Sequence, residues 1–466
     1  MSLSGKAISF NTSDTIAAIA TASGPSGISV IRISGSKAFS IVDKLFSGKI
    51  KPSQAPSHTI HFGLIFNPIS KNLLDEVLLS IFIAPKSYTG ENMIEISCHG
   101  GDFVASQILK LLTKLGARLA EPGEFTKRRV LAGKMDITQA EAVLDLVQAT
   151  NESSYRSAID QLKGKLSGYI QNTTNELATV TAKMENLLEF EVDKKQTKSE
   201  LKKITSQLKS IRINLEQTIK KNEQLKFLRA GIYCVIVGRP NVGKSSLFNR
   251  LGDVEKAIVT EIPGTTRDSI EQTITINGLL LHLVDTAGLK VLMQAKANNK
   301  IEAMGIEKSK NWLEAADFVL AVFDNSSSVT KEDRLVYDAI KQKPHLCVLN
   351  KIDLKPAFNY KFLNREKWYF VSAKYNKGVN LLKNAIARNY KQKSPTSNNN
   401  CLYLNTRHID TLNRVLALVR KSEPEKYLDV SIMNLRNALD ILGNITSAVT
   451  NEQILDIIFA QFCIGK

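Results

Sequence analysis

One loop constrains the fold more than any other feature of this chain. Residues 238–245 read Gly-Arg-Pro-Asn-Val-Gly-Lys-Ser and match the phosphate-binding pattern G-x-x-x-x-G-K-[ST] at every fixed position. The apolar run at residues 232–237 predicts a buried strand before the loop, and residues 246–251 predict a helix after it. In that setting backbone N–H groups face phosphate oxygens, Lys244 reaches the β- and γ-phosphates, and the Ser245 hydroxyl binds Mg²⁺. The loop therefore predicts a nucleotide site.

Four further motifs follow in the order of a guanine-nucleotide switch domain. The carboxylate of Asp353 can accept both N–H donors on the edge of guanine, a pair that adenine does not offer. Asp285 ends an apolar strand, and we expect it to bind the water shell of Mg²⁺. Thr266 is expected to complete the coordination of Mg²⁺, and the Gly288 N–H is expected to sense the γ-phosphate. The loop and the motifs predict nucleotide contacts from Asn241, Val242, Gly243, Lys244, Ser245, Ser246, Gly264, Thr265, Thr266, Asp285, Thr286, Ala287, Gly288, Asn350, Lys351, Asp353, Ser372, Ala373 and Lys374.

The position after the Asp285–Gly288 motif constrains the mechanism of hydrolysis. Ras-like proteins place a water-orienting glutamine there, whereas this chain has Leu289. Since leucine cannot orient water, another carboxylate or amide has to act, and a positive charge has to replace the arginine finger. Asn241 is a candidate ligand for a monovalent cation in that place.

Composition sets broader limits. The 466 residues suffice for about three domains, and no apolar run approaches the roughly 20 residues that span a bilayer. Residues 1–14 lack the apolar core of a secretory signal, and the five cysteines form no C-x-x-C pair, so we expect a cytoplasmic protein without disulfides or a zinc site. The net charge of +17 is compatible with a polyanionic partner or with lysines that are merely solvated.

The periodicity of apolar residues predicts a multidomain α/β protein with four parts: residues 1–122, 123–230, 231–392 and 393–466. The first part is α+β. The second and fourth parts are helical, and we expect them to pack together as one helical domain in two segments, with a Ras-like nucleotide domain inserted between them. Within the first part we predict a helix at residues 103–115 and strands at residues 15–21, 28–34, 58–66, 76–84 and 93–98.

Helices of the other parts follow from apolar residues at a period of 3.6. Before the nucleotide domain, the pattern covers residues 140–147 and 201–219, with a polar break near residues 193–199. After it, three helices are predicted around residues 409–419, 428–442 and 454–462.

Several segments outside the phosphate-binding loop resemble the MnmE (TrmE) family of tRNA uridine-modifying GTPases. The resemblance covers nearly the whole chain. Its most specific parts are the junction at Pro122-Gly-Glu-Phe-Thr-Lys127, the run from Lys134 to Ala142 and the ending Phe462-Cys-Ile-Gly-Lys466. Further matches are Ile31-Arg-Ile-Ser-Gly35, residues 88–101, and residues 259–268, which are typical of the family's potassium-binding loop.

The resemblance implies an activity, cofactors and partners. MnmE-like GTPases act with the flavoprotein MnmG (GidA), an FAD protein, in a heterotetramer that adds a carboxymethylaminomethyl-type group to carbon 5 of the wobble uridine of certain tRNAs. The one-carbon unit comes from 5,10-methylene- or 5-formyl-tetrahydrofolate. The resemblance also implies that residues 1–122 bind the folate and form a homodimer, and that GTP hydrolysis needs Mg²⁺ and K⁺.

Site residues carry over by position. The resemblance implies folate contacts from Arg32, Glu95, Lys134 and Lys466; K⁺ ligands Asn241, Thr260, Ile262 and Thr265; Mg²⁺ ligands Ser245 and Thr266; and further nucleotide contacts from Glu261 and Pro263. It also implies that Glu302 is the hydrolytic glutamate, which would answer the problem posed by Leu289. Arg267 and Cys463 complete the catalytic candidates.

Some interpretations remain open from the residues alone. Cys463 is a candidate for the modification chemistry or a buried helix-end cysteine, and no base adjoins it in sequence. Cys98 and His99 are not expected to act as a pair, since adjacent strand residues point to opposite faces. The lysines of residues 194–226 are interpreted as a solvated helix face rather than an RNA site. A ribosome-assembly or RNA-chaperone GTPase is the alternative function.

Overall fold

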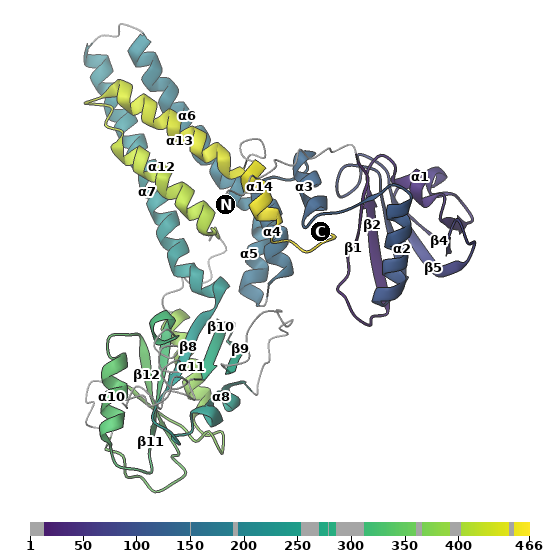
Figure 1. Ribbon diagram of the computed structural model, residues 1–466. Helices are drawn as coiled ribbons and strands as arrows, with labels where there is room; N and C mark the ends of the chain where they lie inside the picture. The colour runs from purple at the N-terminus through teal and green to yellow at the C-terminus, as the bar shows by residue number, and fades with distance from the viewer. Residues whose placement is uncertain are drawn as a thin grey trace, which may run out of the picture. The chain divides into compact units, whose positions relative to one another are not determined.

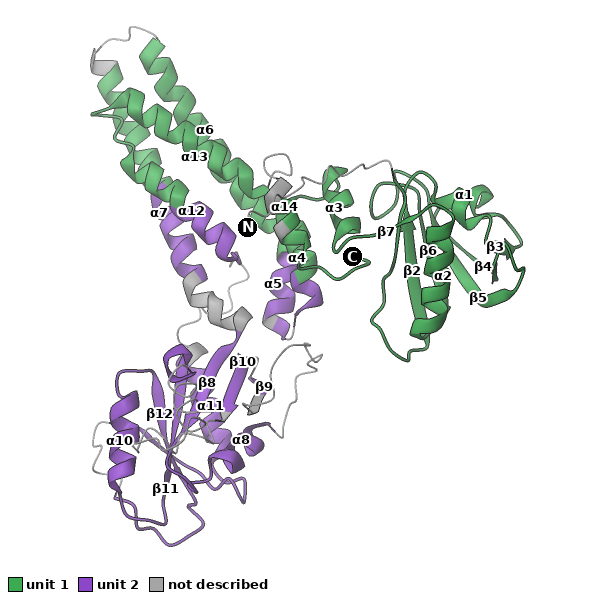
Figure 2. Cartoon of the chain, viewed as in Figure 1, with its two compact units in different colours: residues 1–144, 161–211, 414–466 green, residues 145–160, 212–413 purple. Residues whose placement is uncertain are grey.

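The computed structural model describes most of the chain as two compact units. Residues 14–149, 151–189, 194–252, 270–277, 279–285, 312–359, 366–391, 402–446 and 452–466 are described. Figure 2 colours the first unit green (residues 1–144, 161–211 and 414–466) and the second purple (residues 145–160 and 212–413). Among the described helices, none has both the length and the apolar character needed to cross a membrane.

A seven-stranded sheet forms the N-terminal part, in the order β3-β4-β5-β6-β2-β1-β7 (Figure 1). All neighbours are antiparallel except β1 and β7. Alternation places Ile31 and Ile33 in the core, where Ile108 and Leu112 of the covering helix α2 join them. The elements are β1 Ile16–Ile19, β2 Ile28–Ser34, α1 Ala38–Val42, β3 Phe46–Gly48, β4 Thr59–Phe66, β5 Leu73–Phe82, β6 Met93–His99, α2 Asp102–Lys114 and β7 Arg118–Leu119.

Helices make up the rest of the first unit, and some of them also belong to the second unit, which contains most of α5, the second half of α7 and the first half of α12 (Figure 2). Those from before and after the nucleotide domain lie side by side, since α13 packs along α6 and Arg436 donates a 2.9 Å hydrogen bond to Glu185. At the other end, Phe459 packs against Gly123, whose backbone is left-handed. The helices are α3 Glu124–Leu131, α4 Ile137–Val147, α5 Glu152–Leu162, α6 Lys165–Glu189, α7 Lys194–Ala230, α12 Thr406–Lys421, α13 Leu428–Thr446 and α14 Glu452–Phe459.

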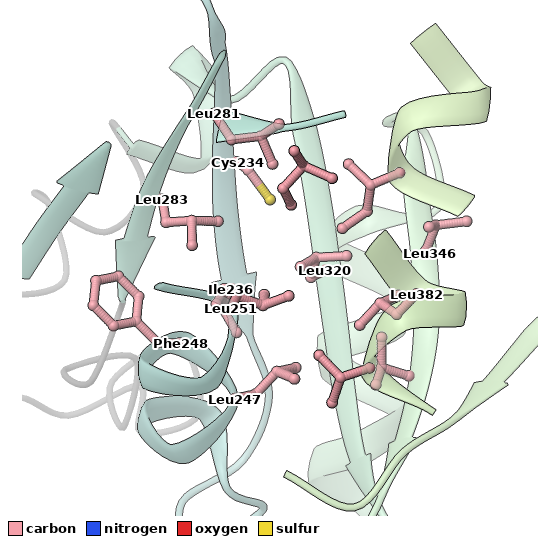
Figure 3. Close-up of a cluster of buried hydrophobic side chains, with 14 of the residues drawn as sticks. Cys234, Ile236, Leu247, Phe248, Leu251, Leu281, Leu283, Leu320, Leu346 and Leu382 are labelled. Carbon is pink, nitrogen blue, oxygen red and sulfur yellow. The ribbon is translucent and has the colours of Figure 1, made fainter. Parts of the chain in front are cut away.

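The second unit is built on a six-stranded sheet in the order β13-β12-β11-β8-β10-β9, parallel except for β9. Its central strands are apolar along their length because helices or loops cover both faces. Figure 3 shows one face, where Leu247 and Phe248 from α8 and Leu382 from α11 meet Ile236 and Leu320. The elements are β8 Ile232–Val237, α8 Lys244–Gly252, β9 Ile270–Ile276, β10 Leu279–Asp285, β11 Phe318–Asp324, α10 Lys331–Ile340, β12 His345–Asn350, β13 Trp368–Phe370 and α11 Val379–Lys391.

The structure confirms most of the predicted elements and corrects several boundaries, among them those of β5, which runs from Leu73 to Phe82 rather than over residues 76–84. Helix α14 ends at Phe459, three residues before the predicted end, and α7 already begins at Lys194, inside the predicted polar break. Polar residues do not interrupt a helix whose other face is buried, and Ile204 and Leu208 of α7 are buried. The short elements α1, β3 and β7 were not predicted. The boundaries of the four-part division stay a prediction.

Burial in the second unit leads to a first prediction. Leu382 is fully buried in α11, whereas its neighbour Leu381 is 71% exposed. We expect Leu382→Ala to lower the free energy of unfolding of this unit by about 2–5 kcal/mol, because it leaves a cavity. Leu381→Ala should change it by less than about 0.5 kcal/mol. The chain's two tryptophans, Trp312 and Trp368, both lie in this unit, so their fluorescence during denaturant unfolding reports on it. Equal effects of the two substitutions would contradict this assignment of the core.

Candidate functional site

The phosphate-binding loop lies where the sequence predicts it, between β8 and the N-terminus of α8. A side chain at Gly238 would place its Cβ 2.3 Å from the carbonyl oxygen of Val322, so the loop passes close to β11. Lys244 is 8% exposed, and its ammonium donates a 3.0 Å hydrogen bond to the carbonyl of Arg239 within the loop. The loop and the helix N-terminus together form an anion-binding cradle.

Asn350, the last residue of β12, joins two loops. Its amide nitrogen donates to the carbonyl of Val242 at 2.9 Å, and its amide oxygen accepts from the N–H of Ala373 at 3.0 Å. The residue is 2% exposed, so both bonds are shielded from water. A Cβ on Gly243, whose φ is 93°, would lie 2.3 Å from the Asn350 amide nitrogen. The phosphate-binding loop and the Ser372–Lys374 loop are therefore held at a fixed separation.

Asp353 lies at the mouth of a cavity of about 550 Å³, which Gly243, Asn350, Ala373 and Lys374 also line. Ser372 donates a 2.6 Å hydrogen bond to one carboxylate oxygen of Asp353, and this bond outweighs the small effect of burial and lowers the pKa of the carboxyl. The carboxylate is thus ionised at neutral pH. It is exposed and able to accept hydrogen bonds from a ligand in the cavity.

Lys351 forms its ion pair with Asp324 rather than with Asp353. Its ammonium lies 2.6 Å from a carboxylate oxygen of Asp324 at the end of β11. Burial alone would raise the pKa of Asp324, but hydrogen bonds from Lys351 and Ser326 outweigh it and lower the pKa. The pair fixes Lys351, whose φ is 64°, beside the cavity.

Part of the predicted nucleotide site lies outside the described residues. Asp285 ends β10, where it pairs in register with Ile236 of β8, so β10 and the phosphate-binding loop end at the same sheet edge. The predicted site residues outside the described ranges are Thr260, Glu261, Ile262, Pro263, Gly264, Thr265, Thr266, Arg267, Thr286, Ala287, Gly288 and Glu302.

A second candidate site lies in the first unit, where the chain's C-terminus meets the N-terminal sheet. Arg32 of β2 donates to Glu95 of β6 at 2.7 Å and to the carbonyl of Gly465 at 3.0 Å. A Cβ on Gly465 would lie 2.4 Å from the carbonyl of Ile19, so the tail passes against the end of β1. Two of the predicted folate contacts thus form a pair, and the C-terminal tail is bonded to it.

The remaining predicted contacts of this site are cations. Burial, and then repulsion from Arg32, lower the pKa of Lys466. Lys134 donates to the carbonyl oxygens of Pro85 and Ser87 in a loop of the N-terminal sheet domain. The structure therefore places both lysines in the first unit: Lys466 lies near Arg32, and Lys134 is bonded to the 85–88 loop.

Tyr88 and Arg129 are part of this arrangement and were not predicted as site residues. The guanidinium carbons of Arg129 and Arg32 lie 4.7 and 5.8 Å from the centre of the Tyr88 ring. The Tyr88 hydroxyl is 3.0 Å from the Thr126 hydroxyl of α3. Tyr88 begins one of the segments that resemble the MnmE family, which was the available signal; nothing in the sequence pairs it with Arg129.

A buried ionic network fixes α3 against the sheet. Arg128 is 5% exposed and bonds Asp14, Glu91 and Glu124. Burial alone would raise the pKa of Glu124, but hydrogen bonds from Arg118 and then Arg128 outweigh it and lower the pKa. The network holds the helix from which Arg129 and Thr126 reach Tyr88.

Comparison with known proteins identifies the family. A model of the MnmE helical domain matches residues 137–463, and a model described as the GTP-binding protein TrmE N-terminus matches residues 15–134. The tRNA modification GTPase MnmE of Acetivibrio thermocellus is 38% identical over 97% of this chain and 99% of that protein. Its namesake in Ligilactobacillus salivarius is 39% identical over 97% and 98%. The chain belongs to the MnmE family.

Among solved structures, the chain resembles the G domain of the T. maritima FeoB iron transporter, with 24% identity, a TM-score of 0.27, and coverage of 34% of this chain and 99% of that one. A likeness of that size adds nothing to the assignment to the MnmE family, which rests on the family models and the curated relatives.

The cysteines of this MnmE-family chain differ in reactivity. Cys463 is exposed. Cys98 is buried, donates to the carbonyl of Ser29, and has a pKa raised to about 11 by burial and by Asp75, so it is a poor nucleophile. His99 points to the other face, where its imidazole lies 2.6 Å from Asp75. As expected for neighbours on a strand, Cys98 and His99 lie on opposite faces of β6, and Cys463 is not a buried helix-end cysteine.

The bridge made by Asn350 leads to a second prediction. Asn350→Ala would leave the Val242 carbonyl and the Ala373 N–H without their partner in a buried place. We expect the free energy of unfolding of the second unit to fall by about 1–3 kcal/mol, followed by tryptophan fluorescence in denaturant. The control is Asn384→Ala on the exposed face of α11, which loses only an exposed hydrogen bond from Asn277 and should change the free energy of unfolding by less than about 0.5 kcal/mol. An unchanged unfolding midpoint in Asn350→Ala would contradict the importance of the bridge.

Proposed function

We propose that this protein is a GTP hydrolase that takes part in tRNA modification. The observation that carries the proposal is one cavity in which the phosphate-binding loop, the Asn350 bridge and the ionised Asp353 carboxylate come together. A purine in that cavity would present its edge to Asp353, which suits the paired N–H donors of guanine. The curated relatives that are called tRNA modification GTPases, and that match nearly the full length, supply the substrate class.

In the proposed cycle each residue of the nucleotide domain has one task. Lys244 exchanges the Arg239 carbonyl for the β- and γ-phosphates, a stronger, charged acceptor. Ser245 and Thr266 would hold Mg²⁺, and Asn241, Thr260, Ile262 and Thr265 would hold K⁺, which would supply positive charge near the phosphates. Glu302 orients the attacking water, and Arg267 assists.

The second candidate site would bind tetrahydrofolate. The Arg32–Glu95 pair offers a carboxylate to the pterin edge and a guanidinium beside it, and Lys134 and Lys466 supply positive charge for a glutamyl tail. Cys463 is exposed on the same C-terminal tail. We propose that this site delivers a one-carbon unit to carbon 5 of the wobble uridine, that a flavoprotein of the MnmG type is the partner, and that the protein works as a homodimer in the cytoplasm.

Cells that lack the gene test the proposed function. We expect mass analysis of bulk tRNA to show loss of the 5-substituted wobble uridines, restored by the intact gene but not by Lys244→Ala, since the loop then loses its phosphate-binding cation. The matched control is Lys331→Ala, an exposed lysine of the same unit, which should restore modification fully. Unchanged uridines in the deletion strain would overturn the proposal and favour a ribosome-assembly GTPase, to be tested by measuring ribosomal precursors.

The proposed cation ligand makes hydrolysis depend on the monovalent ion. We expect GTP turnover by the purified protein to be at least about tenfold faster in K⁺ than in Na⁺, because K⁺ would replace an arginine finger. Asn241→Ala should bring the rate in K⁺ down to the rate in Na⁺ without abolishing nucleotide binding. Equal rates of the intact protein in the two salts would rule out the cation mechanism, whatever the effect on tRNA.

A further inference from the structure

Three side chains with metal-binding atoms meet in the second unit, away from the nucleotide cavity. They are His345 and Cys347 of β12 and Glu366, two residues before β13. One ligand atom from each lies within 4.8 Å of the other two. The parallel register of β12 and β13 explains why these residues lie close together. Cys347 pairs with Trp368, so His345 and Glu366, each two positions earlier, approach each other. We propose that these three residues form a Zn²⁺ site.

The hydrogen bonding of His345 carries the proposal. Its Nδ1 lies 2.8 Å from the carbonyl oxygen of Lys343, and since a carbonyl only accepts, Nδ1 carries the proton. Nε2 is then the ring atom that faces the cluster, 3.3 Å from a carboxylate oxygen of Glu366. The side chain is 9% exposed, and Nε2 has no hydrogen bond among the described residues. A cation between this buried nitrogen and the carboxylate oxygen would satisfy both atoms at once.

The same arrangement is the one that metal-binding histidines use. A histidine ligand commonly donates its second N–H to a backbone carbonyl, which fixes the tautomer, as Lys343 does here. The second oxygen of Glu366 accepts a 2.7 Å hydrogen bond from the Tyr337 hydroxyl, which orients the carboxylate. Both supporting bonds leave the atoms that face the cluster free for a metal.

The donor set selects the metal. A thiolate, an imidazole and a carboxylate suit Zn²⁺, whereas Mg²⁺ prefers oxygen ligands alone. Burial, and then Glu366, raise the pKa of Cys347 to about 12, so the thiol is neutral without a cation. On binding, Zn²⁺ would displace that proton to solvent and keep one water as its fourth ligand. No electron transfer is involved.

The position of the cluster indicates a structural task. β13 is a three-residue edge strand, and its continuation supplies Ser372 and Ala373 to Asp353 and Asn350. Zn²⁺ would join Glu366, just before β13, to β12 and hold the edge strand in register. The site would therefore stabilise the strand that presents the guanine-binding loop, without contacting the nucleotide.

The experiment uses the full-length protein without a histidine tag, free of nucleotide and treated with a chelator. We expect one equivalent of Zn²⁺ per chain in metal analysis, and Co²⁺ should give a thiolate-to-metal charge-transfer band that Zn²⁺ abolishes. Zn²⁺ should also raise the melting temperature followed by tryptophan fluorescence. Glu366→Gln, which keeps an acceptor for Tyr337, and Cys347→Ala should each weaken binding by roughly tenfold or more.

Cys234→Ala is the matched control, because Cys234 is equally buried in β8 of the same sheet but outside the cluster. It should bind Zn²⁺ as the intact protein does. Absence of a stoichiometric site, a Co²⁺ spectrum without the thiolate band, or binding that Glu366→Gln and Cys347→Ala leave unchanged (an adventitious ion only) would each overturn the proposal. If Cys347→Ala does not fold, the partly exposed Glu366→Gln decides alone.

Discussion

The geometry of the nucleotide cavity depends on one buried side chain. Asn350 ends β12 and spans the gap to the loops on either side, bonding the Val242 carbonyl and the Ala373 N–H. The amide donates from its nitrogen and accepts at its oxygen, which an apolar side chain or an ionised carboxylate cannot do, so neither could join these two loops. Because the bonds are shielded from water, losing either would leave a buried polar group unpaired, and the separation of the phosphate end and the base end of the cavity is therefore fixed before any ligand binds.

The parallel sheet explains why these groups meet. β8, β10, β11 and β12 run in the same direction, so the loops that follow them gather at one edge, where ligands of open α/β sheets bind. Their opposite ends carry no nucleotide residue, and there the His345 cluster lies beside the short strand β13. The carboxyl ends of the strands thus carry the residues that line the cavity. At the opposite end, the His345 cluster lies beside β13, the edge strand that leads into the Ser372–Lys374 loop.

Local patterns in the sequence predicted most helices and strands, but they did not predict which residues of distant elements come into contact. The phosphate-binding loop, β8 and α8 follow from residues adjacent in the chain, as does the amphipathic helix α2. The bond between Asn350 and Val242 joins residues 108 positions apart, and that between Arg32 and Gly465 joins residues 433 apart. Such contacts depend on the order of strands in the sheet, which periodicity does not encode. The short strand β7 was missed because its pairing partner β1, and not its own two residues, makes it a strand.

The C-terminal tail shows how one remote contact creates a site. Arg32 and Glu95 alone would form a compensated pair on the sheet, with little attraction for a ligand. The tail that bonds Arg32 through Gly465 also carries Lys466, and burial and then repulsion from Arg32 lower the pKa of the Lys466 ammonium. A carboxylate bound near Lys466 would relieve that repulsion and raise its pKa again. Docking the tail thus places an ammonium beside the Arg32–Glu95 pair, and this ammonium is the group that would attract a carboxylate of the folate proposed above.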